Sequence, residues 1–255
     1  MAVVHGTSED PDRQQSFAEV ACACPDKDFE LLRELLSYDM QCPASCTFAR
    51  REPMGQVIFY VAPSPLHWSR QAEWPWALRN ARLESDHKCL DIGGGWSVLK
   101  FAVAKRCKHL ASLEIDPEFV VKAQGTIDKL GFDNIHQVVG DARKIPYPDN
   151  WFDRVFCISV VEHMKEGHLQ AVREAVRVLK PGGIGLFTMD VVIQGKGDID
   201  FFLNQDGAYD IMKELGIEKV DSPPGDRIGG SHMLDGKIQI VVVMLCYFKP
   251  KGEGK

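Results

Sequence analysis

The 255-residue sequence has no run of about 18 apolar residues free of charge, the length that a membrane-spanning helix needs. It also lacks an excess of positive charge, because 36 aspartates and glutamates outnumber 30 lysines and arginines. No basic block interleaved with aromatic residues occurs. We therefore expect neither a membrane span nor a protein built mainly to hold nucleic acid.

The first residues, MAVVHGTSED, lack the charged and then apolar segments of a secretion signal, so we expect a cytoplasmic protein without disulfides. Four of the eight cysteines lie close together near the N-terminus. Their C-x-C and C-x3-C spacings differ from the C-x2-C half-site of zinc proteins, so we predict no metal site. A reactive-thiol role stays open for Cys22, Cys24, Cys42 and Cys46.

From Lys88 onward, short apolar runs alternate with amphipathic segments of helix length. This alternation predicts an α/β fold in which helices cover both faces of a mostly parallel sheet. Helices are expected at 97–108, 117–130 and 168–179. The expected strands are KCLDI, HLASLEI, IHQVVG, FDRVFCIS, GIGLFTMD and a long closing strand, KIQIVVVMLCYF.

The part of the chain before Lys88 has a different pattern. LHWSRQAEWPWALRNARL predicts a helix with Pro75 in its first turn. We divide the chain into an N-terminal helical lid segment, residues 1–73, and a main domain, residues 74–255. The glycine-rich insert IQGKGDIDFFLNQDG after the fifth strand is a second candidate lid.

The stretch CLDIGGGWSVLK places a glycine turn directly after a buried strand. A dinucleotide fingerprint has a third glycine where Val98 stands, and Asp91 would face the negative pyrophosphate across a few ångströms. S-adenosylmethionine has no phosphate and carries a sulfonium and an ammonium. A carboxylate beside the turn favours this cofactor, and Gly93, Gly94 and Gly95 let the backbone approach it.

Two further acids follow the next two strands. Glu114 ends the second strand, at the spacing from Asp91 at which an acid accepts hydrogen bonds from ribose hydroxyls. Asp141 ends the third strand and can accept from the adenine amine while Ala142 packs on the ring. The structural alternatives are a solvated strand-end acid for Glu114 and the cap of a short turn for Asp141. The carboxyl ends of such strands are where an open α/β sheet binds its ligand.

Four segments in this order, LDIGGGWS, LEIDPEFVVKA, GDARKIPYPDNWFDRVFCISVVEHM and REAVRVLKPGGIGLFTMD, resemble the class I S-adenosylmethionine-dependent methyltransferases. Ser97 stands where the third glycine of that family commonly stands. The resemblance implies a Rossmann-like, seven-stranded, mostly parallel sheet whose last strand is antiparallel. It also implies Asp91 and Gly93 near the methionine, Glu114 on the ribose, and Ile115, Asp141 and Ala142 around the adenine.

The acceptor of the methyl group is less well indicated. Orientation alone can supply much of the acceleration, so a general base is optional, and histidine is its commonest type. For each of the three candidate histidines named below, the alternative is a structural position at the surface or in the core. For the four aromatic residues named with them, the alternative is packing onto the sheet. Arg70 can meet the carboxylate of the cofactor. The remaining candidates are Ser159 at the end of the fourth strand as a cofactor-binding residue, His163, His67 and His232 as bases, and Tyr60, Trp68, Trp74 and Trp76 as acceptor-site walls.

We therefore expect an enzyme that transfers a methyl group from S-adenosylmethionine to a small-molecule acceptor, on oxygen or nitrogen. Methylation of RNA or protein is an alternative. The acidic composition counts against it, as does the tetrad SVVE where amino-group methyltransferases have an N-P-P-Y-like sequence. Two further alternatives are a non-catalytic relative kept for assembly and capture of a metalloid by the N-terminal cysteines. The oligomeric state is left open.

Overall fold

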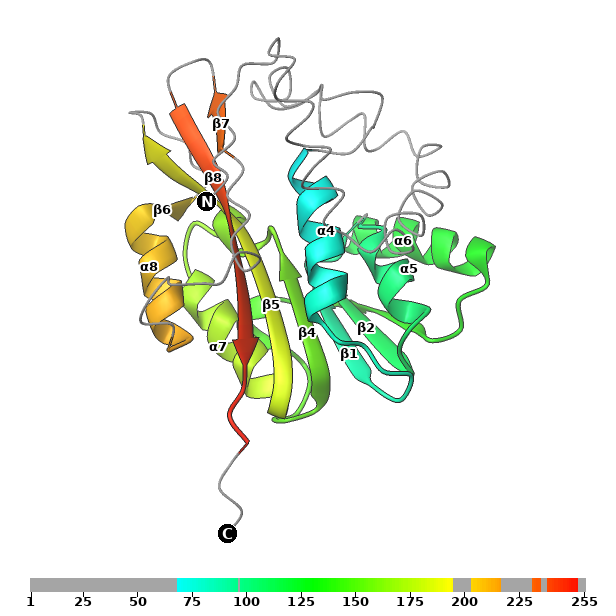
Figure 1. Cartoon of the computed structure of the whole chain (residues 1–255). Coiled ribbons are helices and arrows are strands. Elements are labelled where there is room, and N and C mark those ends of the chain that lie inside the picture. The colour runs from blue at the N-terminus through cyan, green and yellow to red at the C-terminus, as the bar shows by residue number, and fades with distance from the viewer. Residues whose placement is uncertain (1–67, 96, 195–202, 217–230, 235–237, 252–255) are drawn as a thin grey trace.

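A computed structural model of the chain describes residues 68–95, 97–194, 203–216, 231–234 and 238–251 (Figure 1). Side chains at 68–72, 193–194 and 231–241 lie outside this description. The apolar runs form one sheet in the order β3-β2-β1-β4-β5-β8-β7, and the short β6 pairs with β5. The strands are β1 (Lys88–Ile92), β2 (His109–Glu114), β3 (Ile135–Val139), β4 (Phe152–Ile158), β5 (Leu179–Gln194), β6 (Leu203–Asn204), β7 (Ser231–Leu234) and β8 (Ile238–Phe248).

Helices cover both faces of this sheet. The strands alternate between two apolar cores, so that Cys89 of β1 joins one core while Leu90 and Ile92 join the other. The first core lies under α4, α5 and α6, and the second lies under α7 and α8 (Figure 1). The helices are α4 (Trp68–Asn80), α5 (Leu99–Ala104), α6 (Pro117–Leu130), α7 (His168–Val178) and α8 (Gln205–Glu214), with short 3-10 turns η1 (Ala142–Lys144) and η2 (Val161–His163).

The expected sheet is confirmed. Strands β1 to β5 are parallel to their neighbours, and the closing strand β8 runs antiparallel to β5. The seven-membered path of the described sheet is therefore that of a Rossmann-like fold with a reversed last strand. In consequence the ends of β1, β2 and β4 meet at one edge, where the glycine turn lies.

The prediction for Pro75 was wrong. Pro75 lies inside α4, which begins at Trp68, and not in the first turn of a helix. Proline in a helix interior costs about 3 kcal/mol. Trp74 and Trp76 on either side of it are only 5% and 1% exposed, and burial of two large aromatic side chains offsets a cost of that size. The expected boundary between residues 73 and 74 falls within this helix, and the division into lid and domain stays a prediction.

Two other element boundaries differ from expectation. Helix α5 is shorter than 97–108, because the Asn134 side chain donates to the carbonyls of Ala104 and Cys107, at 2.8 and 3.0 Å, and so ends the helix. Strand β5 begins at Leu179, before Pro181, and is longer than the predicted GIGLFTMD. Helix α7 accordingly ends at Val178, within one residue of the predicted end.

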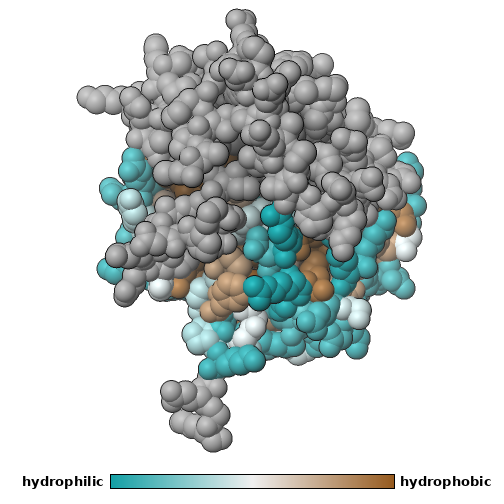
Figure 2. Space-filling model, viewed as in Figure 1, coloured by the Kyte–Doolittle hydropathy of each residue, from teal (hydrophilic) through white to brown (hydrophobic). Residues whose placement is uncertain are grey.

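No described helix is long and apolar enough to cross a membrane. On the face shown in Figure 2, the described surface is mainly hydrophilic, and hydrophobic residues occupy smaller areas between the polar ones.

Arg154 of β4 joins the end of α4 to the sheet. Its guanidinium is 8% exposed and donates to the carbonyls of Ala81, Arg82 and Asp153. Carbonyl groups just after a helix have no partner within the helix, so the buried cation satisfies them. This anchor fixes the end of α4 at the edge of the sheet where β1 and β4 begin, opposite the glycine turn.

The variant Arg154→Met should lower the free energy of unfolding by about 2 to 4 kcal/mol, because the buried carbonyls would lose charged donors. Urea denaturation measures this change. The matched control is Arg173→Met, which removes an ion pair with Glu214 at 2.8 Å from a largely exposed position. That control should cost less than about 1 kcal/mol. Equal losses in both variants would contradict the anchoring role.

Candidate functional site

The glycine turn after β1 is closely surrounded on three sides. Gly93 (φ +64°) donates from its backbone N–H to the carbonyl of Leu113 at 2.7 Å, and a Cβ there would lie 2.6 Å from Val160 Cγ2. A Cβ on Gly94 would lie 2.2 Å from Asp91 Oδ2. Gly95 (φ +35°) donates to Glu114 Oε2 at 3.1 Å. Only glycine fits this backbone path.

Asp91 places a carboxylate beneath this turn. The residue is 3% exposed, and Oδ2 finds no hydrogen-bond partner among the described residues. Burial raises the pKa of Asp91 to about 6; the Lys100 ammonium opposes this shift and the Glu114 carboxylate adds to it. Above that pH the site therefore holds a buried negative charge that is not fully satisfied by hydrogen bonds from the described residues.

Lys100 of α5 supplies a cation to the same place. The residue is 1% exposed, and its ammonium donates to the carbonyl of Gly95 at 2.8 Å and to Ser112 Oγ at 3.2 Å. Ser112 of β2 is the register partner of Asp91 across the β1–β2 pair. The lysine thus reaches from the helix, past the turn, to the strand that neighbours Asp91.

Glu114 is held by backbone donors at the end of β2. Besides Gly95, the N–H groups of Ile115 and Asp116 donate to its Oε1 at 2.8 and 3.2 Å. A carboxylate offers about four acceptor positions, so these three bonds leave capacity for a hydroxyl group. The ribose role of Glu114 stays a prediction. Ile115 is 62% exposed beside it, available for contact with a flat ring.

Asp141 forms the turn cap that was the structural alternative for this residue. Its Oδ1 accepts from the N–H of Arg143 at 2.8 Å, and the Arg143 guanidinium pairs with Oδ2 at 2.6 Å. These hydrogen bonds lower the pKa of Asp141. Ala142 next to it is buried. Both lie where the adenine segment was expected, and their contact with adenine stays a prediction.

A second polar cluster joins α4 to the ends of β4 and β5. Glu73 is fully buried, and its Oε1 accepts from Ser159 Oγ at 2.7 Å and from the Thr188 hydroxyl. Ser159 has a positive φ of 51°, which is uncommon for a residue other than glycine. The same serine donates its N–H to the Thr188 carbonyl at 3.0 Å. The cluster holds the end of β4 in a sharp turn beside the glycine turn, since Val160 contacts Gly93.

The other candidates for the acceptor site lie in varied places. His163 is exposed at the end of η2, whereas its neighbour Glu162 is buried and accepts from the N–H of Asp190 at 3.2 Å. Trp74 and Trp76 pack in the core under α4. The roles proposed for these residues stay predictions. Outside the described residues or side chains lie His67, Tyr60, Trp68, Arg70, His232 and the cysteines Cys22, Cys24, Cys42 and Cys46.

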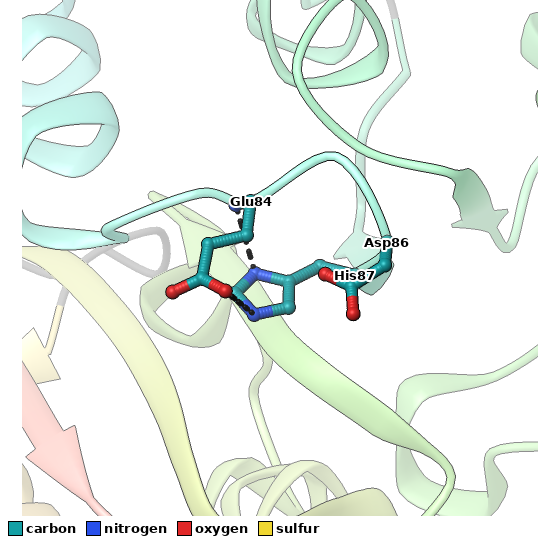
Figure 3. Close-up of side chains that lie close together, drawn as sticks. All are labelled: Glu84, Asp86 and His87. Carbon is teal, nitrogen blue, oxygen red and sulfur yellow. Dashed lines mark hydrogen bonds and ion pairs between the residues drawn. The ribbon is translucent and has the colours of Figure 1, made fainter.

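One cluster at the opposite end of β1 has the composition of a metal site. Ligand atoms of Glu84, Asp86 and His87 lie within 4.8 Å of one another (Figure 3). His87 Nδ1, however, accepts a hydrogen bond from the N–H of Glu84 at 3.1 Å, which closes the turn before β1. The acids are exposed, and such groups gather commonly without an ion, so we assign no metal to this turn.

These residues fit S-adenosylmethionine. The glycines let the turn pack directly against Val160, Asp91 and Ser112, and Asp91 offers a buried, incompletely partnered negative charge. Glu114 has acceptor capacity next to Gly95, and the exposed Ile115 follows it. A sheet of this order with acids at the ends of β1 and β2 is the arrangement that the resemblance to class I S-adenosylmethionine-dependent methyltransferases implied.

Comparison with known proteins agrees with this class. Residues 90–187 match the family model described as "Methyltransferase domain". Methyltransferase GfsG of Streptomyces halstedii is 28% identical over 56% of this chain and 51% of its own length. Norajmaline N-methyltransferase of Rauvolfia serpentina is 36% identical over 42% of this chain and 38% of its own. 2-Methyl-6-phytyl-1,4-hydroquinone methyltransferase 1 of Oryza sativa is 30% identical over 50% of this chain and 38% of its own length.

The chain thus spans about half or less of the length of these relatives. Two solved structures share the fold. The YcgJ protein of Bacillus subtilis has a TM-score of 0.51 at 16% identity and covers 71% of this chain and 99% of its own. The [4+2]-cyclase SpnF has a TM-score of 0.61 at 18% identity and covers 88% of this chain and 97% of its own. Residues 90–187 therefore belong to a methyltransferase domain of the class I S-adenosylmethionine-dependent type.

Several residues of the site were not found from the sequence. A usable signal existed for Lys100, because it is the one charged residue in the apolar run VLKFAVA. Glu73 stands in a similar way before the aromatic run WPWAL. Arg143 gave no such signal, since basic residues after a turn are common. The residues missed are Glu73, Lys100, Ser112, Arg143 and Thr188.

The variant Gly94→Ala should lower the free energy of unfolding by about 1 to 3 kcal/mol, because its Cβ would clash with the Asp91 carboxylate and with Ser112 Oγ. Thermal or urea denaturation measures this loss. Gly125→Ala in α6 is the matched control, since a Cβ there meets nothing within 4 Å and alanine favours the helix. The control should gain about 0.5 to 1 kcal/mol. If Gly94→Ala left the free energy of unfolding unchanged, the turn would not be closely packed.

Proposed function

We propose that this protein transfers a methyl group from S-adenosylmethionine to a small-molecule acceptor, on oxygen or nitrogen. The observation that carries the proposal is the buried Asp91 carboxylate under a glycine turn that admits no side chain. A buried negative charge at the carboxyl edge of the sheet suits a cationic ligand without phosphate. The family of the domain supports the same cofactor.

S-adenosylmethionine supplies an electrophilic methyl group on its sulfonium when it is bound. Asp91 would stabilise the positive charge of the methionine end, and Gly93 to Gly95 would accept its close approach. Glu114 would accept from the ribose hydroxyls. Ile115, Asp141 and Ala142 would surround the adenine, and Arg70 would pair with the carboxylate of the methionine. Holding the reactants in line supplies up to about 7 to 11 kcal/mol, so these contacts carry much of the catalysis.

On the acceptor side, Ser159 would line the boundary between cofactor and acceptor, positioned by Glu73. We propose His163, His67 or His232 as the base where an acceptor needs one, and Tyr60, Trp68, Trp74 and Trp76 as walls of the acceptor site. Residues 1–73 would act as the lid. Small molecules are supported as acceptors by the relatives named for 2-methyl-6-phytyl-1,4-hydroquinone and for norajmaline.

The variant Asp91→Asn should weaken binding of S-adenosylmethionine at pH 8 by at least about tenfold, because the ligand would lose its buried counter-charge. Isothermal calorimetry measures the affinity. Asp128→Asn on the surface of α6 serves as the control and should bind as the wild type does. Unchanged affinity in Asp91→Asn would refute the assignment of the cofactor site.

Asp91 should also change the pH dependence of stability in the unliganded protein. Its folded pKa of about 6 lies above the unfolded value of 3.8, so the folded state binds the proton more tightly. The contribution of Asp91 is therefore present at low pH and is lost as pH rises through about 6. Relative to Asp91→Asn, the wild type should lose about 2 to 3 kcal/mol between pH 4 and pH 7 in urea denaturation. Parallel pH profiles would contradict the burial of this charge.

The reaction itself is tested by transfer of a labelled methyl group to a panel of phenols, amines, sugars and lipids, with RNA and protein as further acceptors. Transfer to at least one small molecule supports the proposal, and transfer to RNA or protein alone replaces it. Binding of S-adenosylmethionine without transfer to any acceptor would favour a non-methylating use of the fold. Unchanged turnover after Cys→Ser at positions 22, 24, 42 and 46 would exclude thiol capture of a metalloid.

A further inference from the structure

A lysine buried among apolar residues lies directly under the glycine turn. Lys100 is 1% exposed, and its helix neighbours from Leu99 to Ala104 are all buried. An ammonium in such surroundings costs several kcal/mol unless hydrogen bonds and an opposite charge compensate it. A leucine or methionine would pack at this position without that cost. The charge of Lys100 therefore calls for a role besides packing.

Two hydrogen bonds join Lys100 to described parts of the proposed cofactor site. The ammonium donates to the Gly95 carbonyl at 2.8 Å and to Ser112 Oγ at 3.2 Å. Ser112 and Asp91 are register partners on neighbouring strands, and a Cβ on Gly94 would touch both side chains. Lys100 thus lies on the same side of the sheet as the Asp91 carboxylate, at the same level.

We propose that Lys100 is a positioning residue of the cofactor site, which tethers the glycine turn to β2 and keeps the Asp91 carboxylate charged for a cationic ligand. This inference rests on the proposed function. It assigns to α5 a role that the glycine motif alone does not contain.

The net charge of these site residues is equal and opposite to the net charge of S-adenosylmethionine. Asp91 and Glu114 contribute two negative charges and Lys100 one positive charge, so the three groups carry one net negative charge. S-adenosylmethionine carries a sulfonium, an ammonium and a carboxylate, and so has one net positive charge. Without Lys100, two carboxylates would face each other across a buried turn, and like charges in such a site disfavour ionisation of one of them.

Each group that acts on Asp91 comes from a different element. Lys100 of α5 lowers the pKa of Asp91, and Glu114 of β2 raises it. On β4, burial raises the pKa of the Cys157 thiol, which therefore stays neutral over the physiological range. Among these described groups, Lys100 is the cation that favours the ionised form of Asp91. Its removal should therefore raise the pKa of Asp91.

The test compares binding of S-adenosylmethionine by the full chain at pH 5.5 to 9.5, in the wild type, Lys100→Met and Lys100→Gln. In the wild type the affinity should fall as the pH drops through about 6. In both variants the midpoint of this fall should move upward by about 1 to 3 pH units, the usual effect of losing a nearby opposite charge. Titration of the ligand itself is common to all curves and does not produce such a difference.

Both variants remove the charge, and one of them keeps a hydrogen-bond donor. The amide of Lys100→Gln can still donate to Gly95 and Ser112, so this variant tests the charge even where Lys100→Met fails to fold. Lys100→Arg keeps the charge and should return the midpoint toward the wild-type value. Lys108→Met, at an exposed position beyond α5, is the control and should leave the curve unchanged.

The outcomes distinguish a failure of this inference from a failure of the proposed function on which it rests. If the wild type binds S-adenosylmethionine and the Lys100 variants share its midpoint, Lys100 does not control Asp91 and the inference is wrong. If the wild type binds no S-adenosylmethionine at any pH, the proposed function fails and the inference fails with it. An upward shift in both variants, absent from Lys108→Met, supports the proposal.

Discussion

The burial of one negative charge constrains the rest of the site. Asp91 sits at the end of β1 with 3% exposure, and a carboxylate there is tolerated only where neighbours compensate it. That requirement explains the adjacent features together. Gly94 must lack a side chain because the carboxylate lies against it, and Lys100 must reach inward from α5. The parallel register must also bring Ser112 level with Asp91.

The fold was predictable because its signals are local. Apolar runs of strand length alternate with amphipathic segments, and the parallel sheet follows from that alternation, with α6 found at its predicted bounds. Errors arose where tertiary packing overrides local preference. Pro75 is a helix-starting residue by propensity, yet the burial of Trp74 and Trp76 extends α4 on both sides of it. Asn134, distant in sequence, ends α5.

The candidate site was predictable only in its backbone and its acids. Asp91, the glycines and Glu114 follow from what a phosphate-free cationic ligand requires at strand ends, and the structure brings them together through Gly95 and Glu114. The partners of those acids were not predictable in this way. Lys100 reaches Gly95 and Ser112 from α5, and Glu73 reaches Ser159 and Thr188 from a helix far away in the chain. Such pairs depend on which faces meet, which one sequence does not show.

The fold by itself does not determine the reaction, since a protein named as a [4+2]-cyclase shares it at a TM-score of 0.61. A sheet of this order needs apolar alternation, short turns and covering helices, and none of these requires a buried ammonium beside a buried carboxylate. Lys100 and Asp91 both oppose stability where they lie, because each must be removed from water. Residues that reduce stability in this way are expected at a site that binds a charged ligand. The buried charges under the turn, one of them with a carboxylate oxygen that has no hydrogen-bond partner among the described residues, are therefore a stronger argument for a cationic cofactor than the strand order or the glycines alone.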